Sequence, residues 1–326
     1  MKRTQQSILP DGLIRQLQDV IGPAQVSADL LSLSAVAADA SHYLLMPGAL
    51  VRATTADDVA RAMAAARRHK VGLTFRSGGT SLSGQGLTDG IMVDTRRAFR
   101  GIEVLDEGRR VRVQPGATIR AVNTVLARYQ RKLGPDPASS VACTVGGVLA
   151  DNSSGMSCGT IANSYQTLES MVIVLASGTV LDTADPDADD KLCSTEPELV
   201  EILLRLRETC RRPEHAERIR HLFSMKNTMG YGLNSFLDHD SPSQILSHLM
   251  IGSEGTLGFI ASAVMRTLPV MPQISTALLH FPTLESAAKA LPALLESGVA
   301  VTELMDSASL EPVSYTHLTL PTILLV

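Results

Sequence analysis

The stretch that decides the fold is Phe75-Arg76-Ser77-Gly78-Gly79-Thr80-Ser81-Leu82-Ser83-Gly84-Gln85-Gly86, a glycine- and serine-rich loop that follows the apolar run Val71 to Phe75. A glycine loop that leaves a strand lets neighbouring backbone N–H groups point outward together, and such a nest of donors binds phosphate oxygens. The loop has the GxxxxG spacing of a nucleoside-triphosphate loop, but Gln85 stands where that motif needs a lysine. It also lacks the third glycine of the dinucleotide motif GxGxxG, because Asp89 occupies that position. The loop is therefore predicted to bind phosphate groups, with neither ATP nor NAD as its expected ligand.

A strand–helix–strand unit is predicted to lead into this loop. Gly48 to Ala53 resembles an edge strand, and Thr55 is placed to cap a helix over Asp57 to Lys70 that Gly72 ends. Acidic residues in the first turn of that helix and basic residues in its last turn complement the helix dipole. The strand Val71–Phe75 then delivers the loop. An amphipathic helix over residues 10–22 is predicted to precede the whole unit.

Beyond the loop the chain alternates predicted strands and helices. Residues 110–114 alternate apolar and charged side chains, which predicts a strand with one face in water. From Thr276 a new strand–helix–strand pattern is predicted to start a separate lobe, over Ala277–Phe281, Leu284–Ser297 and Val299–Glu303. The other predicted elements are strands at Ile91–Asp94, Gly101–Val104, Met171–Ala176 and Thr179–Asp182, a helix after Pro115-Gly116, and a helix over Glu198–Cys210.

Three further glycine-rich regions are spread along the chain. Leu133 opens a predicted loop region that runs to Tyr165 and contains two of them, and the third lies at Gly252–Gly258. Any one of these segments alone is typical of an ordinary loop, since glycine and serine are common turn residues. Together with the loop at 75–86, they fit one long anionic cofactor held between two lobes.

Composition excludes several classes of function. The 326 residues are 44% hydrophobic and 19% charged, with a net charge of −4, which predicts a large core in two or more lobes and gives no nucleic-acid-binding surface. No stretch approaches the roughly 18 consecutive apolar residues of a membrane span. The N-terminus also lacks the apolar core of a signal peptide, so a cytoplasmic location is expected, with peripheral attachment to the inner membrane as the alternative.

Neither the cysteines nor the histidines have the spacing of a metal site. None of the four cysteines forms a CxxC pair, so reduced and partly buried thiols are expected. The eight histidines are scattered along the chain, so no metal site is predicted.

The glycine-rich motifs, in this order, resemble the p-cresol methylhydroxylase-type FAD-binding domain of the vanillyl-alcohol oxidase superfamily. The similarity runs from about Asp39 to Leu268 and is closest to the branch of glycolate oxidase subunits and D-lactate or D-2-hydroxyglutarate dehydrogenases. Within this branch the motifs are most similar to those of long bacterial proteins that carry a C-terminal iron–sulfur region. The motifs that carry the resemblance are Phe75–Gly84, Gly134-Pro135-Asp136-Pro137, Thr144-Val145-Gly146-Gly147, Asn152-Ser153-Ser154-Gly155, Lys226-Asn227-Thr228-Met229-Gly230-Tyr231 and Ile251–Gly258.

The resemblance implies a set of FAD-binding residues. The first loop would bind the pyrophosphate, and Ile260, after Gly258, would lie near the adenine. The residues toward the flavin end would be Pro135 and Asp136, with Ser139, Gly146 and Gly147 nearby. The residues that close over the ribityl and phosphate portion would be Asn152, Ser154 and Gly155. Some members attach FAD through a histidine in the first loop, and since Thr80 stands after Gly79 here, a non-covalent FAD is expected. The implied cofactor-binding residues are Arg76, Ser77, Gly78, Gly79, Thr80, Ser81, Gly84, Gln85, Pro135, Asp136, Ser139, Gly146, Gly147, Asn152, Ser154, Gly155, Gly258 and Ile260.

The resemblance also implies an α+β fold and an activity. Two FAD-binding subdomains, at about 45–105 and 106–270, are expected to follow an N-terminal helical segment (1–44) and to precede the start of an α+β cap domain (271–311). The implied activity is oxidation of a D-2-hydroxy acid to the 2-oxo acid, with electrons passed to an iron–sulfur domain, a quinone or an electron-transfer flavoprotein. A sugar or alditol oxidase and a non-catalytic FAD-binding fragment or subunit are the alternatives.

The C-terminal end departs from this pattern. Leu304 to Leu310 is typical of a helix start, but Pro312 to Val326 abandons the pattern. An N-terminal fragment of a longer protein with a non-native tail over residues 312–326 is therefore expected, and a native exposed β-tail is the alternative. Family members draw their substrate-binding arginine and metal-binding histidines from the cap, so the sequence assigns no catalytic base.

Overall fold

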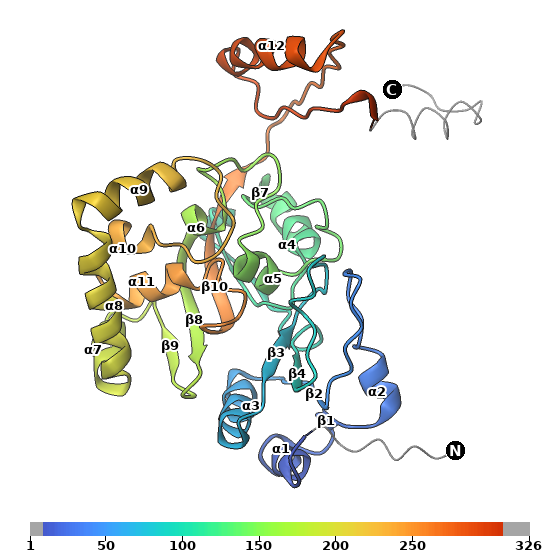
Figure 1. Cartoon of the computed structure of the whole chain (residues 1–326), viewed down its shortest axis with the longest axis vertical. Helices are drawn as coiled ribbons and strands as arrows, with labels where there is room; N and C mark the ends of the chain where they lie inside the picture. Colours follow the sequence, from blue (N-terminus) through green and yellow to red (C-terminus); the bar gives the residue numbers. More distant parts are fainter. Residues whose placement is uncertain (1–8, 309–326) are drawn as a thin grey trace, which may run out of the picture. The chain divides into compact units, whose positions relative to one another are not determined.

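The computed structural model describes residues 9–308, and contacts divide the chain into two compact units, Met1–Val270 and Met271–Val326 (Figure 1). The first unit holds both β-sheets and all the predicted cofactor-binding residues. None of the helices in the described part of the chain is long and apolar enough to cross a membrane.

The first sheet contains four short strands in the order β1-β2-β4-β3: Val26–Ser27, Ala49–Val51, Ile91–Asp94 and Leu73–Arg76. Strands β2 and β3 run parallel to the central β4, and β1 is antiparallel to β2. The expectation of an edge strand at Gly48–Ala53 is wrong, because β2 pairs on both sides. Its three residues are apolar and buried, as an inner strand covered on both faces requires.

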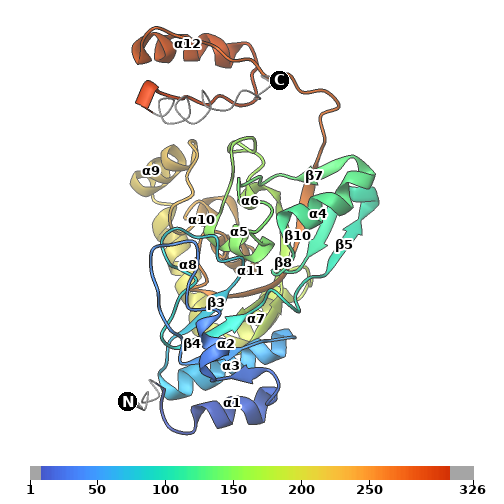
Figure 2. The ribbon, with the colours of Figure 1, turned by 90° about the vertical axis from the view of Figure 1, so that its right-hand side faces the viewer.

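Helices α1 (Leu13–Ile21) and α3 (Ala56–His69) lie side by side against this sheet (Figure 2). The predicted cap of α3 is confirmed: Asp58 N donates to Thr55 Oγ1 (3.1 Å), and Thr55 N donates to Asp58 Oδ2 (3.1 Å). The helix ends earlier than predicted, because Lys70, not Gly72, takes the left-handed conformation (φ 54°) that closes the last turn. A short helix, α2 (Leu30–Ser34), packs beside β2.

The second sheet is antiparallel throughout and is built around the twelve-residue strand β10 (Gly258–Pro269). On one side β10 pairs with β6 (Arg110–Val113) and β6 with β5 (Ile102–Leu105); on the other it pairs with β8 (Leu168–Leu175) and β8 with β9 (Val180–Asp182). The end of β10 pairs with β7 (Arg131–Leu133). In β6, Val111 and Val113 are buried and Arg112 is exposed, which confirms the predicted alternation.

Helices cover the core face of this sheet. They are α4 (Ile119–Leu126), α5 (Val145–Asp151), α6 (Ser164–Thr167), α7 (Ala188–Thr195), α8 (Pro197–Cys210), α10 (Ser235–Asp238) and α11 (Pro242–Leu249). Helix α9 (Pro213–Phe223) packs on α8. The predicted loop at Leu133–Tyr165 therefore contains α5, so Gly146 and Gly147 lie in a helix and not in a tight turn. The helix forms because three of its side chains are buried against the second sheet, those of Val145, Val148 and Leu149. This burial outweighs the poor helix propensity of the two glycines.

Aromatic packing joins the two sheets. Phe259 of β10 contacts Phe75 (ring centroids 5.0 Å apart) and Phe99 (5.3 Å apart). Phe259 and Val174 of the second sheet share a core cluster with Val93 of the first. The loop that follows β3 therefore leaves the first sheet directly beside the second.

The second unit contains helix α12 (Leu284–Glu296), which Thr283 caps as Ser286 N donates to Thr283 Oγ1 (3.1 Å). The strands predicted at Ala277–Phe281 and Val299–Glu303 are wrong. A strand needs a partner for its backbone groups, and neither segment pairs with another strand between residues 271 and 308. The predicted tail at 312–326 lies outside the described residues.

Candidate functional site

The buried side chain of Arg76 holds the loop after β3 in place. This side chain is 6% exposed, and its guanidinium donates from Nη2 to the carbonyl of Ala38 (2.7 Å) and from Nη1 to that of Gly86 (3.4 Å). Gly79 (φ 68°) must be a glycine, because a Cβ there would lie 2.6 Å from Arg76 Nη2. Arg76 thus ties the end of the loop at Gly86 to the neighbouring segment at Ala38, and both of these hydrogen bonds go to backbone carbonyls.

The backbone of the loop offers a run of free donors. Within the described residues, the N–H groups of Gly78, Gly79, Thr80, Ser81 and Leu82 donate no hydrogen bond. Gly78 to Ser81 are half-buried and Leu82 is exposed, so these five donors are open to an acceptor from outside the chain. A pyrophosphate supplies several acceptor oxygens, and this is the chemistry that the sequence predicts for the loop.

The loop lies directly on the segment that enters α5. A Cβ on Gly78 would lie 2.6 Å from the carbonyl oxygen of Ala142 and 2.9 Å from Cys143 Cα. Ser77 Oγ hydrogen-bonds Thr144 Oγ1 and accepts from Gly147 N (3.1 Å). The structure therefore brings the first and third predicted motifs together, through contacts that only a glycine at position 78 permits.

The motif Gly134–Pro137 pairs with the motif Asn152–Gly155. Asp136 N donates to the carbonyl of Ser154 (3.0 Å), and a Cβ on Gly155 (φ 76°) would lie 2.3 Å from the carbonyl oxygen of Asp136. Lys226 Nζ donates to the carbonyl of Gly155 (2.5 Å). Lys226 begins the Lys226–Tyr231 motif, so that motif also reaches this cluster.

The segment Gly252–Gly258 is hydrogen-bonded to the end of α5. Gly252 N donates to the carbonyl of Leu149 (3.1 Å), and Glu254 N donates to that of Ala150 (2.9 Å). Next to this contact, Asn152 ends α5 in the left-handed conformation (φ 56°) and is 9% exposed. Its Oδ1 and the buried Ser253 Oγ have no hydrogen-bond partner in the described part of the chain.

An acid pair links three of the segments. The Glu254 carboxyl lies beside Asp151 and the amide of Gln85, and its partial burial, reinforced by the Asp151 charge, raises its pKa to about 7. Gln85 Oε1 accepts from Ser81 Oγ within the first loop. The side chains of the loop at 81–85, the end of α5 and the segment at 252–258 therefore form one hydrogen-bonded rim.

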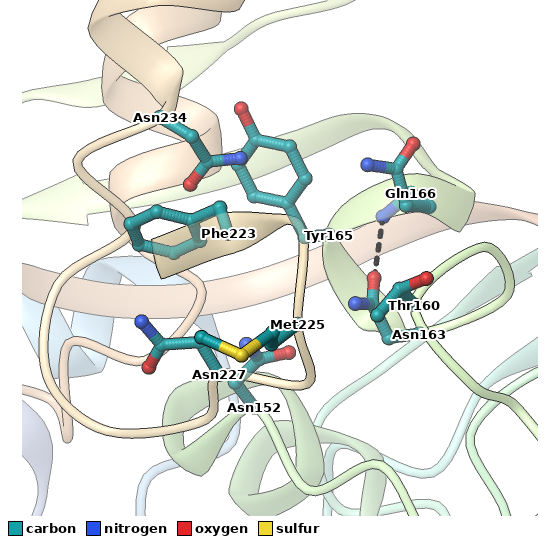
Figure 3. Close-up of a pocket in the computed structure, with 10 residues that line it drawn as sticks. Asn152, Thr160, Asn163, Tyr165, Gln166, Phe223, Met225, Asn227 and Asn234 are labelled. Atoms are coloured by element: carbon teal, nitrogen blue, oxygen red, sulfur yellow. Dashed lines mark hydrogen bonds between the residues drawn. The ribbon is translucent and has the colours of Figure 1, made fainter. Parts of the chain in front are cut away.

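Asn152 also lines a small cavity of ≈ 30 Å³, which Figure 3 shows. Asn227, Tyr165 and Asn234 line it as well. Asn234 is 9% exposed; its Nδ2 donates to Asp238 Oδ2 (3.1 Å), and its Oδ1 has no partner among residues 9–308. The sequence predictions missed Asn234, because nothing in the motifs separates this amide from an ordinary loop residue.

Tyr165, which lines the cavity, packs against two histidine rings. Tyr165 Oη donates to Asp238 Oδ2 (2.7 Å), and the His248 ring lies 4.9 Å from that of Tyr165 and 4.0 Å from that of His239. Burial, with a smaller effect of His239, lowers the pKa of His248 to about 4. His248 is therefore a neutral core residue near neutral pH. No group of histidines, cysteines and carboxylates in the described residues could hold a metal ion.

The remaining predicted residues are farther from the loop or have structural contacts. Gly258 begins β10, and a Cβ there would lie 2.7 Å from the carbonyl oxygen of Val174. Ile260 is buried in the core of the second sheet. The Ser139 carbonyl accepts from Ala142 N and Cys143 N, both at 2.8 Å, so Ser139 shapes the turn on which Gly78 rests.

The site fits FAD on its own geometry, because the unpaired donors at 78–82 suit a pyrophosphate, and the orphaned oxygens of Asn152 and Ser253 suit the hydroxyl groups of a sugar or ribityl chain. Comparison with known proteins agrees. Residues 47–184 match the family model of an FAD-binding domain.

Two curated relatives are similar over most of the chain. A D-2-hydroxyglutarate dehydrogenase of Pseudomonas putida is 33% identical over 254 residues, which are 76% of this chain and 25% of the relative. A glycolate oxidase subunit of Escherichia coli is 25% identical, over 83% of this chain and 45% of the relative. The chain thus spans between a quarter and a half of the length of these two relatives.

A solved structure shows the fold. An alkyldihydroxyacetonephosphate synthase is similar with a TM-score of 0.58 and 19% identity, over 89% of this chain and 47% of that protein. The α+β architecture and the match to an FAD-binding domain indicate a flavoprotein. The FAD-binding domain at residues 47–184 and the similarity to a D-2-hydroxyglutarate dehydrogenase and a glycolate oxidase subunit confirm the resemblance seen in the sequence.

Proposed function

We propose that this chain holds FAD without a covalent bond and belongs to an enzyme that oxidises a D-2-hydroxy acid to its 2-oxo acid. The observation that carries the proposal is the run of five unpaired N–H groups from Gly78 to Leu82. FAD, when bound, supplies the acceptor for the hydride that leaves the carbon bearing the hydroxyl group. The names of the similar dehydrogenases and of the glycolate oxidase subunit support the substrate class.

The protein's part in this chemistry is to bind and orient. The loop at 77–81 would hold the pyrophosphate through its N–H groups, with Ser77 fixed by Gly147 N so that the loop keeps its shape. Asp136 and Gly155, joined by backbone pairing, would support the flavin end. Asn152 and Ser154 would satisfy polar groups of the ribityl chain, and Gly258 and Ile260 would lie toward the adenine.

The residue at position 80 supports the proposal of non-covalent attachment. Thr80 follows Gly79, and the loop from 75 to 86 has no histidine to form a bond with the flavin. Electrons would then pass to an iron–sulfur domain, a quinone or an electron-transfer flavoprotein in the cytoplasm or at the inner membrane. The chain matches only 25% of the length of the D-2-hydroxyglutarate dehydrogenase relative, so this acceptor is proposed for the whole protein.

The test is to purify the chain, record its flavin absorbance, and precipitate it with acid. We expect a yellow protein whose flavin stays in the supernatant. A colourless protein that ignores added FAD would contradict the cofactor, and flavin in the pellet would contradict non-covalent binding.

The substrate class is tested on the flavin-loaded chain under anaerobic conditions. D-lactate or D-2-hydroxyglutarate is expected to bleach the flavin, and a polyol is expected to leave it oxidised. Bleaching by the polyol alone would point to a sugar or alditol oxidase. A flavin that no substrate reduces would point to an FAD-binding part without turnover of its own.

A further inference from the structure

A second polar pocket lies where β6 and β7 pair with the end of β10. It has a volume of ≈ 440 Å³ and is lined by four arginines, Arg109, Arg110, Arg131 and Arg266, and by two carboxylates, Asp106 and Glu169. None of these residues belongs to the set proposed to hold FAD.

The charges of this arginine pocket do not balance. Both carboxylates contact the same guanidinium: Arg110 pairs with Asp106 and also with Glu169, at 3.2 Å. The pocket carries two more positive than negative side chains, and neither carboxylate forms an ion pair with Arg109, Arg131 or Arg266 in the described structure. The excess charge is therefore concentrated on three guanidinium groups around one depression.

The register of the strands also brings two of these positive charges together. Arg266 of β10 lies directly opposite Arg110 of β6 in the antiparallel register. Like charges at directly opposed positions of a sheet destabilise it. Asp106 and Glu169 offset the charge of Arg110, and an anion in the pocket would offset the charge of Arg266.

Two of the arginines are held in place by the backbone. Arg131 donates from Nε to Thr267 Oγ1 (2.6 Å) and from Nη2 to the Thr267 carbonyl (2.7 Å), and Thr267 is itself buried. Arg266 Nη2 donates to the carbonyl of Gln166. Guanidinium groups fixed in this way lose little side-chain entropy when they bind a ligand.

Arg109 is the remaining donor. Its carbonyl is fixed by Thr267 N (3.0 Å), which sets the position of its backbone beside the pocket. Its guanidinium has no hydrogen-bond or ion-pair partner among the described residues. It is thus free to complete the contact with a bound anion.

We propose that the arginine pocket binds a small dianion, whose two negative charges on oxygen are shared by dicarboxylates and by phosphate groups. Planar guanidinium groups bind both kinds of oxyanion through paired N–H···O bonds. The volume lies within the ordinary range for small-molecule sites, about 300–1,000 Å³. The pocket is a separate site from the loop at 78–82.

The test is calorimetric titration of the purified chain, saturated with FAD, with inorganic phosphate and with succinate at constant ionic strength. Acetate and chloride serve as monovalent controls. The variant Arg109→Gln is expected to raise the dissociation constant of the dianion about tenfold, because one charge-assisted contact is lost. The exposed Arg218 of α9 gives a matched control, Arg218→Gln, with the same change of charge and unchanged binding.

A third variant sharpens the result. Glu169→Gln releases Arg110 from one of its two carboxylates and is expected to tighten dianion binding several-fold. A preference for phosphate over succinate would identify a phosphate-bearing ligand, and the reverse would identify a dicarboxylate. The proposal is overturned if Arg109→Gln binds the dianion as the wild type does, or if acetate and chloride bind as tightly as the dianions.

Discussion

The loop after β3 and the arginine pocket beside β10 both present hydrogen-bond donors, but they obtain them differently. The donors of the loop are uncharged backbone N–H groups, and those of the pocket are guanidinium groups. Binding at the loop therefore depends on glycines that let the backbone adopt one shape. Binding at the pocket should depend on charge, so the two regions respond to different changes.

The largest effect is expected from Gly78→Ala. The new Cβ would meet Ala142 O at 2.6 Å and Cys143 Cα at 2.9 Å, both backbone atoms that cannot move aside alone. We expect FAD affinity to fall at least tenfold and the free energy of unfolding to fall by about 1–3 kcal/mol, the usual cost of overpacking. Flavin fluorescence titration and thermal denaturation measure the two quantities.

Gly72→Ala is the matched control for this change. Position 72 directly precedes β3, its φ lies outside the left-handed region, and a Cβ there would meet no atom within 4 Å. The variant should keep its FAD affinity and its unfolding temperature, because the new methyl group enters open space. Equal losses in the two variants would show that the approach of the loop to residues 142–144 is not what matters.

Salt is expected to separate the two regions next. Raising the ionic strength from about 0.01 M to 1 M shortens the Debye length from about 30 Å to 3 Å. Dianion binding at the exposed arginines should weaken at least tenfold, whereas FAD binding at the neutral loop should change less. Paired titrations over this range provide the measurement, and an equal slope for both ligands would remove the distinction.

A smaller effect concerns the rim of the loop. Because the pKa of Glu254 is raised from an ordinary 4.5 to about 7, its protonated form stabilises the folded state, and this contribution is lost as the pH rises through 7. The melting temperature should fall by no more than about 2–4 °C, since the carboxyl is partly exposed and screened. Glu254→Gln should flatten this part of the pH profile.

The contribution of His248 has the opposite sign and a lower pH range. Its pKa is lowered from 6.5 to about 4 by burial, so its stabilising contribution is present above pH 6.5 and is lost as the pH falls toward 4. His248→Gln should reduce the loss of stability between these values without affecting the change near pH 7. Thermal melts of both variants from pH 4 to 8 would reveal any coupling between the two groups.

The sequence predicts the elements whose signals are local. Thr55 and the charge order after it predict α3 correctly, and the alternation at 110–114 predicts β6. The helix α5 was missed because its two glycines are typical of a turn, whereas burial of Leu149 and its neighbours decides its conformation. The two strands of the second unit were predicted from apolar runs alone, which carry no information about a pairing partner.

The candidate site shows the same division. Each glycine motif is one continuous stretch of sequence, so its chemistry can be predicted before the fold is known. The arginine pocket joins residues 109–110, 131 and 266, and only the register that places Arg266 opposite Arg110 brings them together. No pattern of spacing in a single sequence predicts that register.

The central claim is that the loop at 78–82 binds a pyrophosphate, and a comparison of flavins tests it most directly. The flavin-free chain would be titrated with FAD, FMN and riboflavin, which share the flavin ring and differ in their phosphates. We predict that FAD binds at least a hundredfold more tightly than riboflavin, that FMN lies between them, and that Gly78→Ala removes most of the difference. Riboflavin binding as tight as that of FAD would contradict the account.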